Sequence, residues 1–421
     1  MILFLALTLL LVIGLPVSFS LGLSAMLAIS LAGMPLSTVA LRMTDALNSF
    51  ALLALPLFML SGALMEFGCT PRIIRFVNML LARTSGGLGS VTIASCMFFS
   101  SISGSGSATV AAIGGVTAKD LIRQNYDRGY VASMLAAAGG LGILIPPSIP
   151  MVVYGIVAQV SISHLFIAGV VPGILIGLCL IAYNTVLARR NGYGVAETRR
   201  YTREEALKIT YDALLPLGMP VVVLGGILAG AITPTEASVV ATVYAFIMSA
   251  LIYRELTWPR FMQACANAMT ASTMILFVIA CANAFAWYLT IQNISGQIAQ
   301  AFVSFSDNGV VVMLMITALL LLLGTFMETS SIILITTPIL LPIVKSIGFD
   351  PVHYGILLIV NLIVGAMTPP LAVTLFISSR LCGITMQQSF PHILYLIGLY
   401  VVLLLVLTFV PAISLWLPAH L

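Results

Sequence analysis

Two short stretches of the sequence combine small hydroxyl side chains with turn-forming positions inside otherwise apolar segments. The first, SSISGSGSATVAAIGG (100–115), holds serines and glycines without a charge, and the second, FMETSS (326–331), holds one carboxylate. Double prolines interrupt two further apolar segments, LGILIPPSIP (141–150) and VGAMTPPLAV (364–373). Proline lacks an N–H donor and disrupts the preceding turn, so it leaves main-chain carbonyl oxygens free. Such oxygens suit hard cations such as sodium, while the N-termini of half-helices favour an anion.

Composition places these stretches in a lipid bilayer. The chain is 61% hydrophobic and 7% charged, whereas soluble domains carry about 25% charged residues. Apolar segments long enough to cross a hydrocarbon core recur from end to end. We therefore expect an all-α polytopic membrane protein, with a single integral membrane domain over 1–421. In lipid, free backbone groups are tolerated only where they line a cavity or are buried in protein, so the interrupted segments should form a site.

The apolar segments divide the chain into predicted spans. Two of them, about 88–117 and about 310–344, are interrupted midway by SGSGSAT and METSS, which is typical of re-entrant helical hairpins. An amphipathic helix along the membrane interface is predicted over 72–83, with a less apolar counterpart at 295–306. The remaining predicted spans are 2–14, 16–32, 50–66, 131–158, 165–188, 213–232, 236–253, 271–290, 354–379 and 394–417.

The two halves of the chain share these features at one constant spacing. The shift that places the double proline 146–147 on 369–370 also places the first hairpin tip on the second. Small residues alone indicate helix packing, and a double proline alone indicates a kink. Their joint recurrence favours a secondary transporter built from repeats with broken helices. We predict a first repeat over 1–210 and a second over 211–421.

The distribution of positive charge predicts the orientation. With both hairpins re-entrant, all of the 17 Lys and Arg residues except Arg42 and Lys345 fall on one side. The positive-inside rule makes that side cytoplasmic. The first hairpin then enters from the cytoplasm and the second from outside, so the repeats are inverted and both termini lie outside. The basic interval 189–212 suits contact with anionic lipid headgroups.

Ionisable side chains offer few candidates for chemistry at mid-membrane. Glu328 sits at the second hairpin tip, and two interpretations stay open: a functional ligand or an N-terminal cap of the next half-helix. Glu236 is predicted to cap a helix. The histidines fall at predicted span ends or in loops, which favours sodium over proton coupling; they are His164, His353, His392 and His420.

Several function classes are disfavoured by what the sequence lacks. GSGS could supply the nucleophile of an intramembrane serine hydrolase, but no histidine lies in a predicted span core to act as its base. The sequence contains neither HExxH nor the ATP-binding pattern GxxxxGK[ST]. We expect no enzyme, no use of ATP and no nucleic-acid partner.

Six segments, taken in order, resemble those of one transporter family. They are NSFALLALPLFMLSGALM, SGSGSATVAAIG, LGILIPPSIPMVVYG, ITPTEASVVATVYA, FMETSSIILITTPILLPI and TPPLAVTLF. The family is the large membrane subunit of tripartite ATP-independent periplasmic (TRAP) transporters, and the likeness covers nearly the whole chain. The resemblance implies an elevator fold, with a scaffold over about 1–66, 165–290 and 394–417 and a transport part over about 88–158 and 310–379.

The resemblance also implies a function. It implies sodium-coupled uptake of an organic acid, a C4-dicarboxylate or a sugar acid, across a bacterial inner membrane, with both termini periplasmic. A periplasmic binding protein would deliver the substrate, and a small four-helix membrane subunit would be a second partner. The alternative is a sodium/dicarboxylate symporter that needs no binding protein.

The resemblance also assigns candidate site residues, each placed by its position in the matching motif. The resemblance places a first sodium site at Ser103, Ser105, Gly142, Ile145 and Pro147, and a second at Thr325, Thr329, Gly365 and Met367. Substrate candidates at the two tips and breaks are Gly104, Gly106, Ser107, Ser148, Glu328, Ser330, Thr368 and Thr374. Thr374 stands where many members have Asn, and Arg380 is an unusual charge near the end of that helix.

Overall fold

A computed structural model describes residues 2–81, 86–194, 201–294, 296–298, 300 and 308–420. In these residues all regular structure is helical. Seven of the described helices are long and apolar enough to cross a membrane, and an eighth span is made if α3 and the bent helix after it count together. The expected class, an all-α polytopic membrane protein, is confirmed.

The first half of the chain contains two interrupted segments among its helices. Its elements are α1 (Ile2–Val12), α2 (Val17–Leu31), α3 (Ser37–Leu47), η1 (Phe50–Leu53), α4 (Ala54–Met65), α5 (Cys69–Leu81), α6 (Gly87–Ser103), α7 (Gly106–Arg123), α8 (Arg128–Gly140), η2 (Leu141–Ile143), α9 (Ile149–Ala158) and α10 (Ile162–Asn191). The predicted hairpin is α6 and α7, and the predicted span 131–158 is broken into α8, η2 and α9.

The second half of the chain also contains two interrupted segments. Its elements are α11 (Arg203–Leu228), α12 (Pro234–Phe246), the π-helical η3 (Ile247–Ile252), α13 (Trp258–Ile291), α15 (Gly309–Phe326), α16 (Thr329–Ser346), α17 (Pro351–Met367), α18 (Val373–Cys382), α19 (Met386–Phe409) and α20 (Ala412–His420). The second hairpin is α15 and α16, and the span 354–379 is broken into α17 and α18. Most of the predicted counterpart 295–306 lies outside the described residues.

Several predicted boundaries are wrong. Helices α11 and α13 begin at Arg203 and Trp258, before the predicted apolar spans. The early part of α11, 203–212, is polar, and that of α13, 258–270, mixes polar with apolar residues. Helix α3 was not predicted as a span, and it meets the following helix at a bend of 62°. The predicted span 394–417 is two helices, α19 and α20, separated at Val410 and Pro411.

The hairpin arms are longer than half a membrane. Helix α6 has 17 residues and α7, α15 and α16 have 18 each. At a rise of 1.5 Å per residue each arm is about 26 Å long, close to the hydrocarbon thickness of about 30 Å. The structure shows both helical hairpins. How deeply each one enters the membrane stays a prediction.

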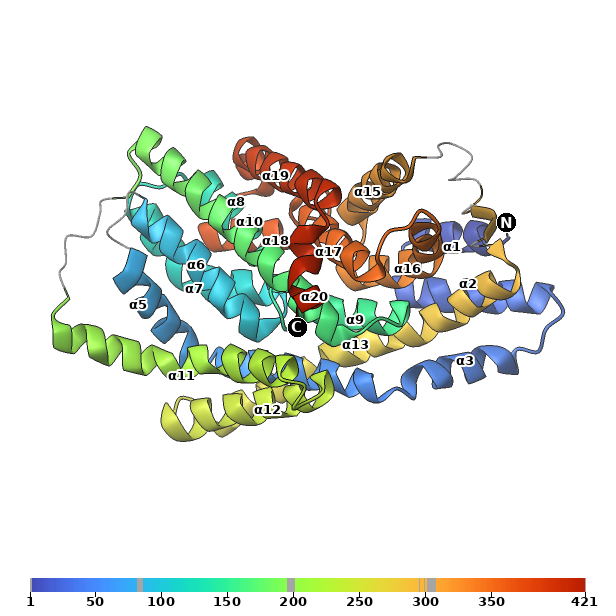
Figure 1. Ribbon diagram of the computed structural model, residues 1–421, viewed down its shortest axis with the longest axis horizontal. Helices are drawn as coiled ribbons and strands as arrows, with labels where there is room; N and C mark the ends of the chain where they lie inside the picture. The colour runs from blue at the N-terminus through green and yellow to red at the C-terminus, as the bar shows by residue number, and fades with distance from the viewer. Residues whose placement is uncertain are drawn as a thin grey trace.

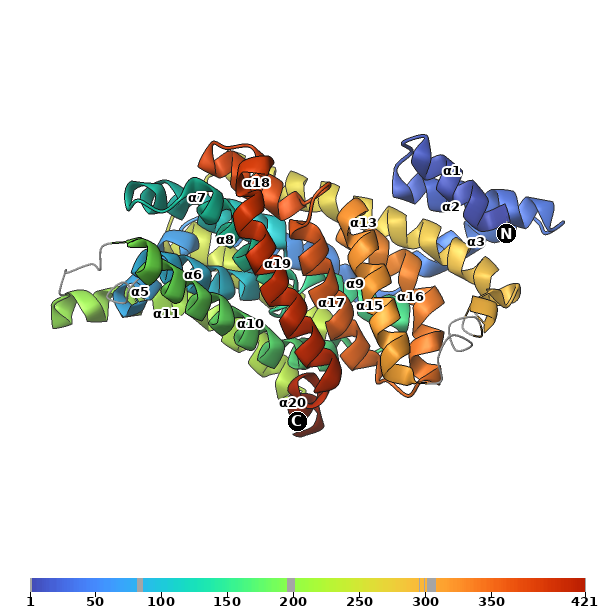
Figure 2. The ribbon, with the colours of Figure 1, turned by 90° about the horizontal axis from the view of Figure 1, so that it is seen from above.

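The core of the molecule lies along two broken segments. From Gly129 to Gly140 every residue of α8 is buried, and so is every residue of α17 from His353 to Gly365. Around them, α8 contacts α7 and α18, α9 contacts α16, and α15 contacts α17. Helix α13 contacts α2, α3 and α4 at the other side of the molecule (Figures 1 and 2). Helices α10 and α19, which belong to the predicted scaffold, contact α6, α8 and α17 of the predicted transport part. The division into scaffold and transport parts, and their relative movement, stay predictions.

A buried amide joins α10 to the base of the first hairpin. The Asn184 Nδ2 group donates to the Gly86 carbonyl and to Ser90 Oγ, each at 3.0 Å, and Asn184 Oδ1 accepts from the Tyr130 hydroxyl at 3.0 Å. Burying such an amide unpaired would cost about 1–3 kcal/mol. The contact fixes the end of α10 against α6 and α8.

Candidate functional site

The tip of the first hairpin is a short turn built from hydroxyl groups. Gly104 ends α6 at φ 61°, a left-handed conformation that favours glycine. Ser105 then caps α7, its Oγ lying 3.5 Å from the Ala108 N–H. Behind the turn, Ser103 Oγ lies 2.9 Å from Thr109 Oγ1, and Thr109 Oγ1 donates to the Ser105 carbonyl at 2.9 Å. The turn is uncharged and rich in oxygen atoms.

The break between α8 and α9 packs directly on this tip. The peptide bond between Pro146 and Pro147 is cis. Ser148 donates to the Ile143 carbonyl at 2.6 Å and caps α9. The Ile149 N–H donates across to the Gly104 carbonyl at 3.2 Å. Main-chain contact therefore joins the hairpin to the broken helix.

Most residues of the predicted first sodium site meet here. A Cβ on Gly142 would lie 2.5 Å from the Ser105 carbonyl oxygen, and a Cβ on Gly104 would lie 2.8 Å from the Pro147 carbonyl oxygen. Ile145 lies in the same break. Within the described part of the chain, the carbonyl oxygens of Gly142, Ile145 and Pro147 accept no backbone hydrogen bond. Hydroxyl and free carbonyl oxygens gathered in this way suit a hard monovalent cation.

The tip of the second hairpin carries a carboxylate. Glu328 Oε2 accepts from the N–H groups of Ser330 at 2.9 Å and Ser331 at 3.2 Å, and Oε1 accepts from Ser330 Oγ at 3.2 Å. Glu328 is thus the N-cap of α16, as one interpretation of the sequence had it. The same side chain also lines the central cavity, so capping and exposure to a ligand coexist.

The second break repeats the contacts of the first with different residues. A Cβ on Gly365 would lie 2.5 Å from the Gly324 Cα, so α15 and α17 touch glycine to glycine. The Leu371 N–H donates to the Thr325 carbonyl at 3.1 Å, which again joins a tip to a break. The Pro369–Pro370 bond is cis, as in the first break.

The residues predicted for the second sodium site are spread around this contact. Thr325 and Gly365 lie on the facing helices α15 and α17, Thr329 opens α16 and lines the cavity, and Met367 is buried at the end of α17. The Thr325 carbonyl is already occupied by the Leu371 N–H. The oxygen cluster is therefore less complete than at the first site.

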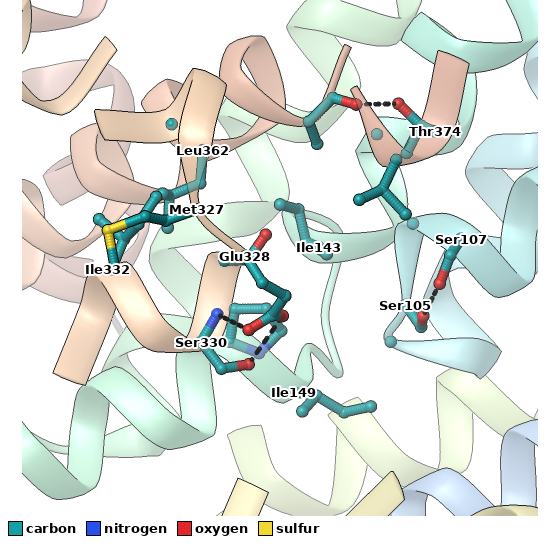
Figure 3. A pocket seen from close by; sticks show the side chains of 18 of the residues that line it. Ser105, Ser107, Ile143, Ile149, Met327, Glu328, Ser330, Ile332, Leu362 and Thr374 are labelled. Atoms are coloured by element: carbon teal, nitrogen blue, oxygen red, sulfur yellow. Dashed lines mark hydrogen bonds between the residues drawn. The ribbon is translucent and has the colours of Figure 1, made fainter. Parts of the chain in front are cut away.

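A cavity of about 200 Å³ lies between the two tips. Figure 3 shows Glu328 and Ser330 of the second hairpin across this cavity from Ser105 and Ser107 of the first. Of the described residues that line it, Glu328 alone carries a formal charge. The predicted substrate residues that line it are Gly104, Gly106, Ser107, Glu328, Ser330 and Thr374.

Two predicted substrate residues lie outside the cavity lining. Ser148 is buried and directs its hydroxyl to the Ile143 carbonyl, and Thr368 donates to the Val364 carbonyl at 2.6 Å. Thr374 lines the cavity, but its hydroxyl donates to the Ala366 carbonyl at 2.8 Å. Arg380 is exposed at the end of α18 and lies 4.4 Å from the centroid of the Phe376 ring, away from the cavity lining.

Sequence reasoning missed the walls that come from other helices. Met59 of α4 and Ile275 of α13 line the cavity, and both belong to the predicted scaffold. Each is one apolar residue among many on an apolar helix, so nothing in the sequence singles it out. Their presence places the cavity at the contact between the predicted scaffold and transport parts.

Comparison with known proteins now gives the family. Residues 4–413 match the family described as tripartite ATP-independent periplasmic transporter, DctM component. The chain belongs to this family. It is a TRAP transporter large permease, a multi-pass membrane protein and not an enzyme, and the resemblance seen in its motifs is confirmed.

Relatives within the TRAP family are similar along nearly the whole chain. The isethionate permease DctMQ of Oleidesulfovibrio alaskensis is 40% identical over 96% of this chain, which spans 64% of that protein's length. The C4-dicarboxylate large permease DctM of Pseudomonas aeruginosa is 38% identical, covering 95% of this chain and 93% of that one. The sialic acid large permease SiaM of Vibrio cholerae is 34% identical, covering 96% and 95%.

Solved structures of other transporters share the fold. The YdaH transporter of Alcanivorax borkumensis aligns with a TM-score of 0.59 at 16% identity, covering 91% of this chain and 88% of that one. MtrF of Neisseria gonorrhoeae aligns with a TM-score of 0.56 at 15% identity, covering 88% of this chain and 83% of that one. At these identities the likeness concerns the fold alone.

The double role of Glu328 leads to a prediction. Glu328→Ala removes the acceptor for two N–H groups and should lower the free energy of unfolding by about 1 kcal/mol, whereas Glu328→Gln keeps an acceptor oxygen and should stay close to the parent. Thermal unfolding in detergent measures this difference. If the charge also serves the ligand, both variants should lose uptake by the reconstituted transporter.

Asp350 provides the matched control for Glu328. It caps α17 through the N–H groups of Val352 at 2.8 Å and His353 at 3.0 Å, and it does not line the cavity. Asp350→Asn should therefore leave uptake unchanged. Full uptake by Glu328→Gln would show that the carboxylate only caps the helix.

Proposed function

We propose that this chain is the substrate-translocating subunit of a sodium-coupled TRAP transporter that takes up a small organic acid. The observation that carries the proposal is the meeting of two hairpin tips and two broken helices around one cavity. Secondary transporters with broken helices place ions at freed carbonyls and anionic groups at half-helix N-termini. Half-helix N-termini open at this cavity, and the free carbonyl oxygens of Gly142, Ile145 and Pro147 belong to the break that packs on the first tip.

The substrate's acid group is proposed to bind at the N-terminus of α7. Four half-helices begin at the cavity, at Gly106, Ile149, Thr329 and Val373. The N-terminus of α16 is already compensated by the Glu328 carboxylate, which accepts its first N–H groups. At the N-terminus of α18 the Thr374 hydroxyl is already used by the Ala366 carbonyl. The N-terminus of α7 combines its N–H groups with the Ser105 and Ser107 hydroxyls, so we place the anion there. Glu328 would then accept from a hydroxyl of the substrate.

Sodium is proposed to act by stabilising the tips. Ser103, Ser105 and the carbonyls of Gly142, Ile145 and Pro147 would hold one ion, and Thr325, Thr329, Gly365 and Met367 would hold a second. A bound ion shifts a conformational equilibrium only by its difference in affinity for the two states. An ion that binds only when tip and break are in contact would favour the substrate-binding arrangement.

The transport step is proposed to be an elevator movement. The cavity has walls from the hairpins and from Met59 and Ile275 of the predicted scaffold, so sliding of one part along the other would carry the cavity across the membrane. The proposal includes the inner membrane, both termini on the periplasmic side, a small four-helix subunit and a periplasmic binding protein. Relatives named for isethionate, C4-dicarboxylates and sialic acid suggest C4-dicarboxylates, sugar acids and small sulfonates as the first substrates to test.

Reconstituted uptake tests this function. Proteoliposomes that contain the permease with its small subunit should accumulate a labelled acid only when an inward sodium gradient and the cognate binding protein are both present. Collapse of the sodium gradient should remove uptake, while a proton gradient alone should not restore it. Rapid uptake without any binding protein would instead support the binding-protein-independent symporter.

A further inference from the structure

A second small cavity lies between α5 and α11, far along the chain from the hairpin tips. Its volume is about 140 Å³, and Arg72, Arg75, Lys208, Ile209 and Asp212 line it. The two helices contact each other and run side by side at one end of the molecule in both ribbon views (Figures 1 and 2). The cavity is separate from the site described above.

The charges that line this cavity do not cancel. Arg72 is compensated, because its Nη1 lies 2.9 Å from Glu255 Oε1 and its guanidinium lies 3.7 Å from the Tyr253 ring centroid. Arg75 and Lys208 are exposed, and among the described residues neither has a carboxylate oxygen within 4.0 Å. Arg75 and Lys208 contribute two positive charges and Asp212 one negative charge, so the cavity lining carries a net charge of about +1 once Arg72 is paired. A phosphodiester carries one negative charge and would balance it.

Apolar surface continues from the charged cavity on α11. Leu207, Tyr211 and Leu214 are exposed and follow one another at helical spacing, so they form one stripe beside Lys208. A lipid needs basic residues to bind its anionic headgroup and neighbouring apolar side chains to contact its acyl chain, and both are present here.

A neighbouring cavity extends the site towards the first hairpin. It has a volume of about 420 Å³ and shares Arg75 and Ile209 with the charged cavity. Its apolar walls include Leu88 of α6 and Val116 of α7, and its polar walls include Thr117 and Asp120, whose carboxylate is paired with Arg123 at 3.2 Å. A ligand with a phosphate and hydrocarbon groups therefore fits this region better than a free ion does.

The placement of both helices agrees with a membrane interface. Helix α5 buries Cys69, Ile73 and Val77 and exposes basic residues, as interfacial amphipathic helices do. Lys208 lies in the second turn of α11, just before its long apolar part. On the predicted topology this level is the cytoplasmic leaflet, which carries anionic lipids.

We propose that the cavity between α5 and α11 binds the phosphodiester of an anionic phospholipid. Arg75 and Lys208 hold the phosphate, Asp212 accepts from a headgroup hydroxyl, and an acyl chain covers Leu207, Tyr211 and Leu214. Helix α5 connects α4 to the first hairpin, and α11 belongs to the predicted scaffold. The lipid thus joins the two helices at the membrane surface.

Lipid titration of the purified full chain tests the proposal. Phosphatidylglycerol added in mixed micelles should raise the midpoint of thermal unfolding, and phosphatidylcholine should not. In the double variant Arg75→Gln/Lys208→Gln the apparent affinity for phosphatidylglycerol should fall about tenfold. The control, Arg128→Gln/Arg380→Gln, removes equal charge from exposed residues of α8 and α18, outside the basic interval 189–212, and should keep the parent affinity. An equal fall in both variants, or no fall in the first, would overturn the site.

Two further arms keep the test decisive. Inorganic phosphate in phosphatidylcholine micelles should give no stabilisation; if it reproduces the full rise, the ligand is soluble phosphate and the lipid assignment fails. If the double variant does not fold, native mass spectrometry of Lys208→Gln replaces it. One fewer bound phosphatidylglycerol than the parent supports the site, and an unchanged number overturns it.

Discussion

Replacing Gly142 by alanine is expected to raise the sodium concentration needed for half-maximal uptake at least about tenfold. The new Cβ would lie 2.5 Å from the Ser105 carbonyl oxygen and 2.7 Å from Thr109 Oγ1, so the tip must move away from the break. Overpacking of this kind costs about 1–3 kcal/mol, and 1.4 kcal/mol corresponds to tenfold in an equilibrium constant. Uptake by proteoliposomes across a range of sodium concentrations measures the change.

Gly115 of the same hairpin supplies the control for Gly142. It lies in α7, and a Cβ there would have nothing within 4 Å. Gly115→Ala should therefore keep the parent's sodium dependence. Unchanged sodium dependence in Gly142→Ala, with the variant folded, would contradict an ion site formed between tip and break.

Replacing Gly365 by alanine is expected to abolish uptake and to destabilise the second hairpin. The Cβ would lie 2.5 Å from the Gly324 Cα and 2.7 Å from the Gly324 carbonyl carbon and oxygen. A backbone neighbour cannot rotate aside as a side chain can, so α15 and α17 must separate. Small residues allow this close approach of membrane helices, and losing it should cost about 1–3 kcal/mol of unfolding free energy. Thermal unfolding and uptake report the two effects separately.

Gly398 of α19 is the matched position for this test. A Cβ there would meet nothing within 4 Å, so Gly398→Ala should resemble the parent in both measurements. A Gly365→Ala protein that unfolds at the parent's temperature and transports normally would show that the second break needs no such contact.

The hairpins and breaks could be predicted because local chemistry decides them. A double proline interrupts a helix wherever it occurs, because it removes two N–H donors and clashes with the preceding turn. SGSGS in an apolar segment favours a turn whose polar groups can be satisfied within the protein. That Ser103, Ser105 and Gly142 come together is implied by the family resemblance and not by local chemistry. The cap made by Glu328 follows from the same local rule.

The parts that could not be predicted depend on tertiary packing. Met59 and Ile275 reach the cavity only because α4 and α13 pack beside the hairpins. Asn184 hydrogen-bonds with Gly86, Ser90 and Tyr130, which lie far from it in the sequence. The early starts of α11 and α13 lie in polar or mixed sequence, where hydropathy gives no clear signal for a span.

Each hairpin tip is attached to its neighbouring break by one amide-to-carbonyl link, from Ile149 to Gly104 and from Leu371 to Thr325. Such links involve atoms that every amino acid except proline possesses. Evolution can therefore exchange the groups that recognise the cargo while the attachment stays in place. One inherited framework can in this way serve chemically different nutrients without being rebuilt for each.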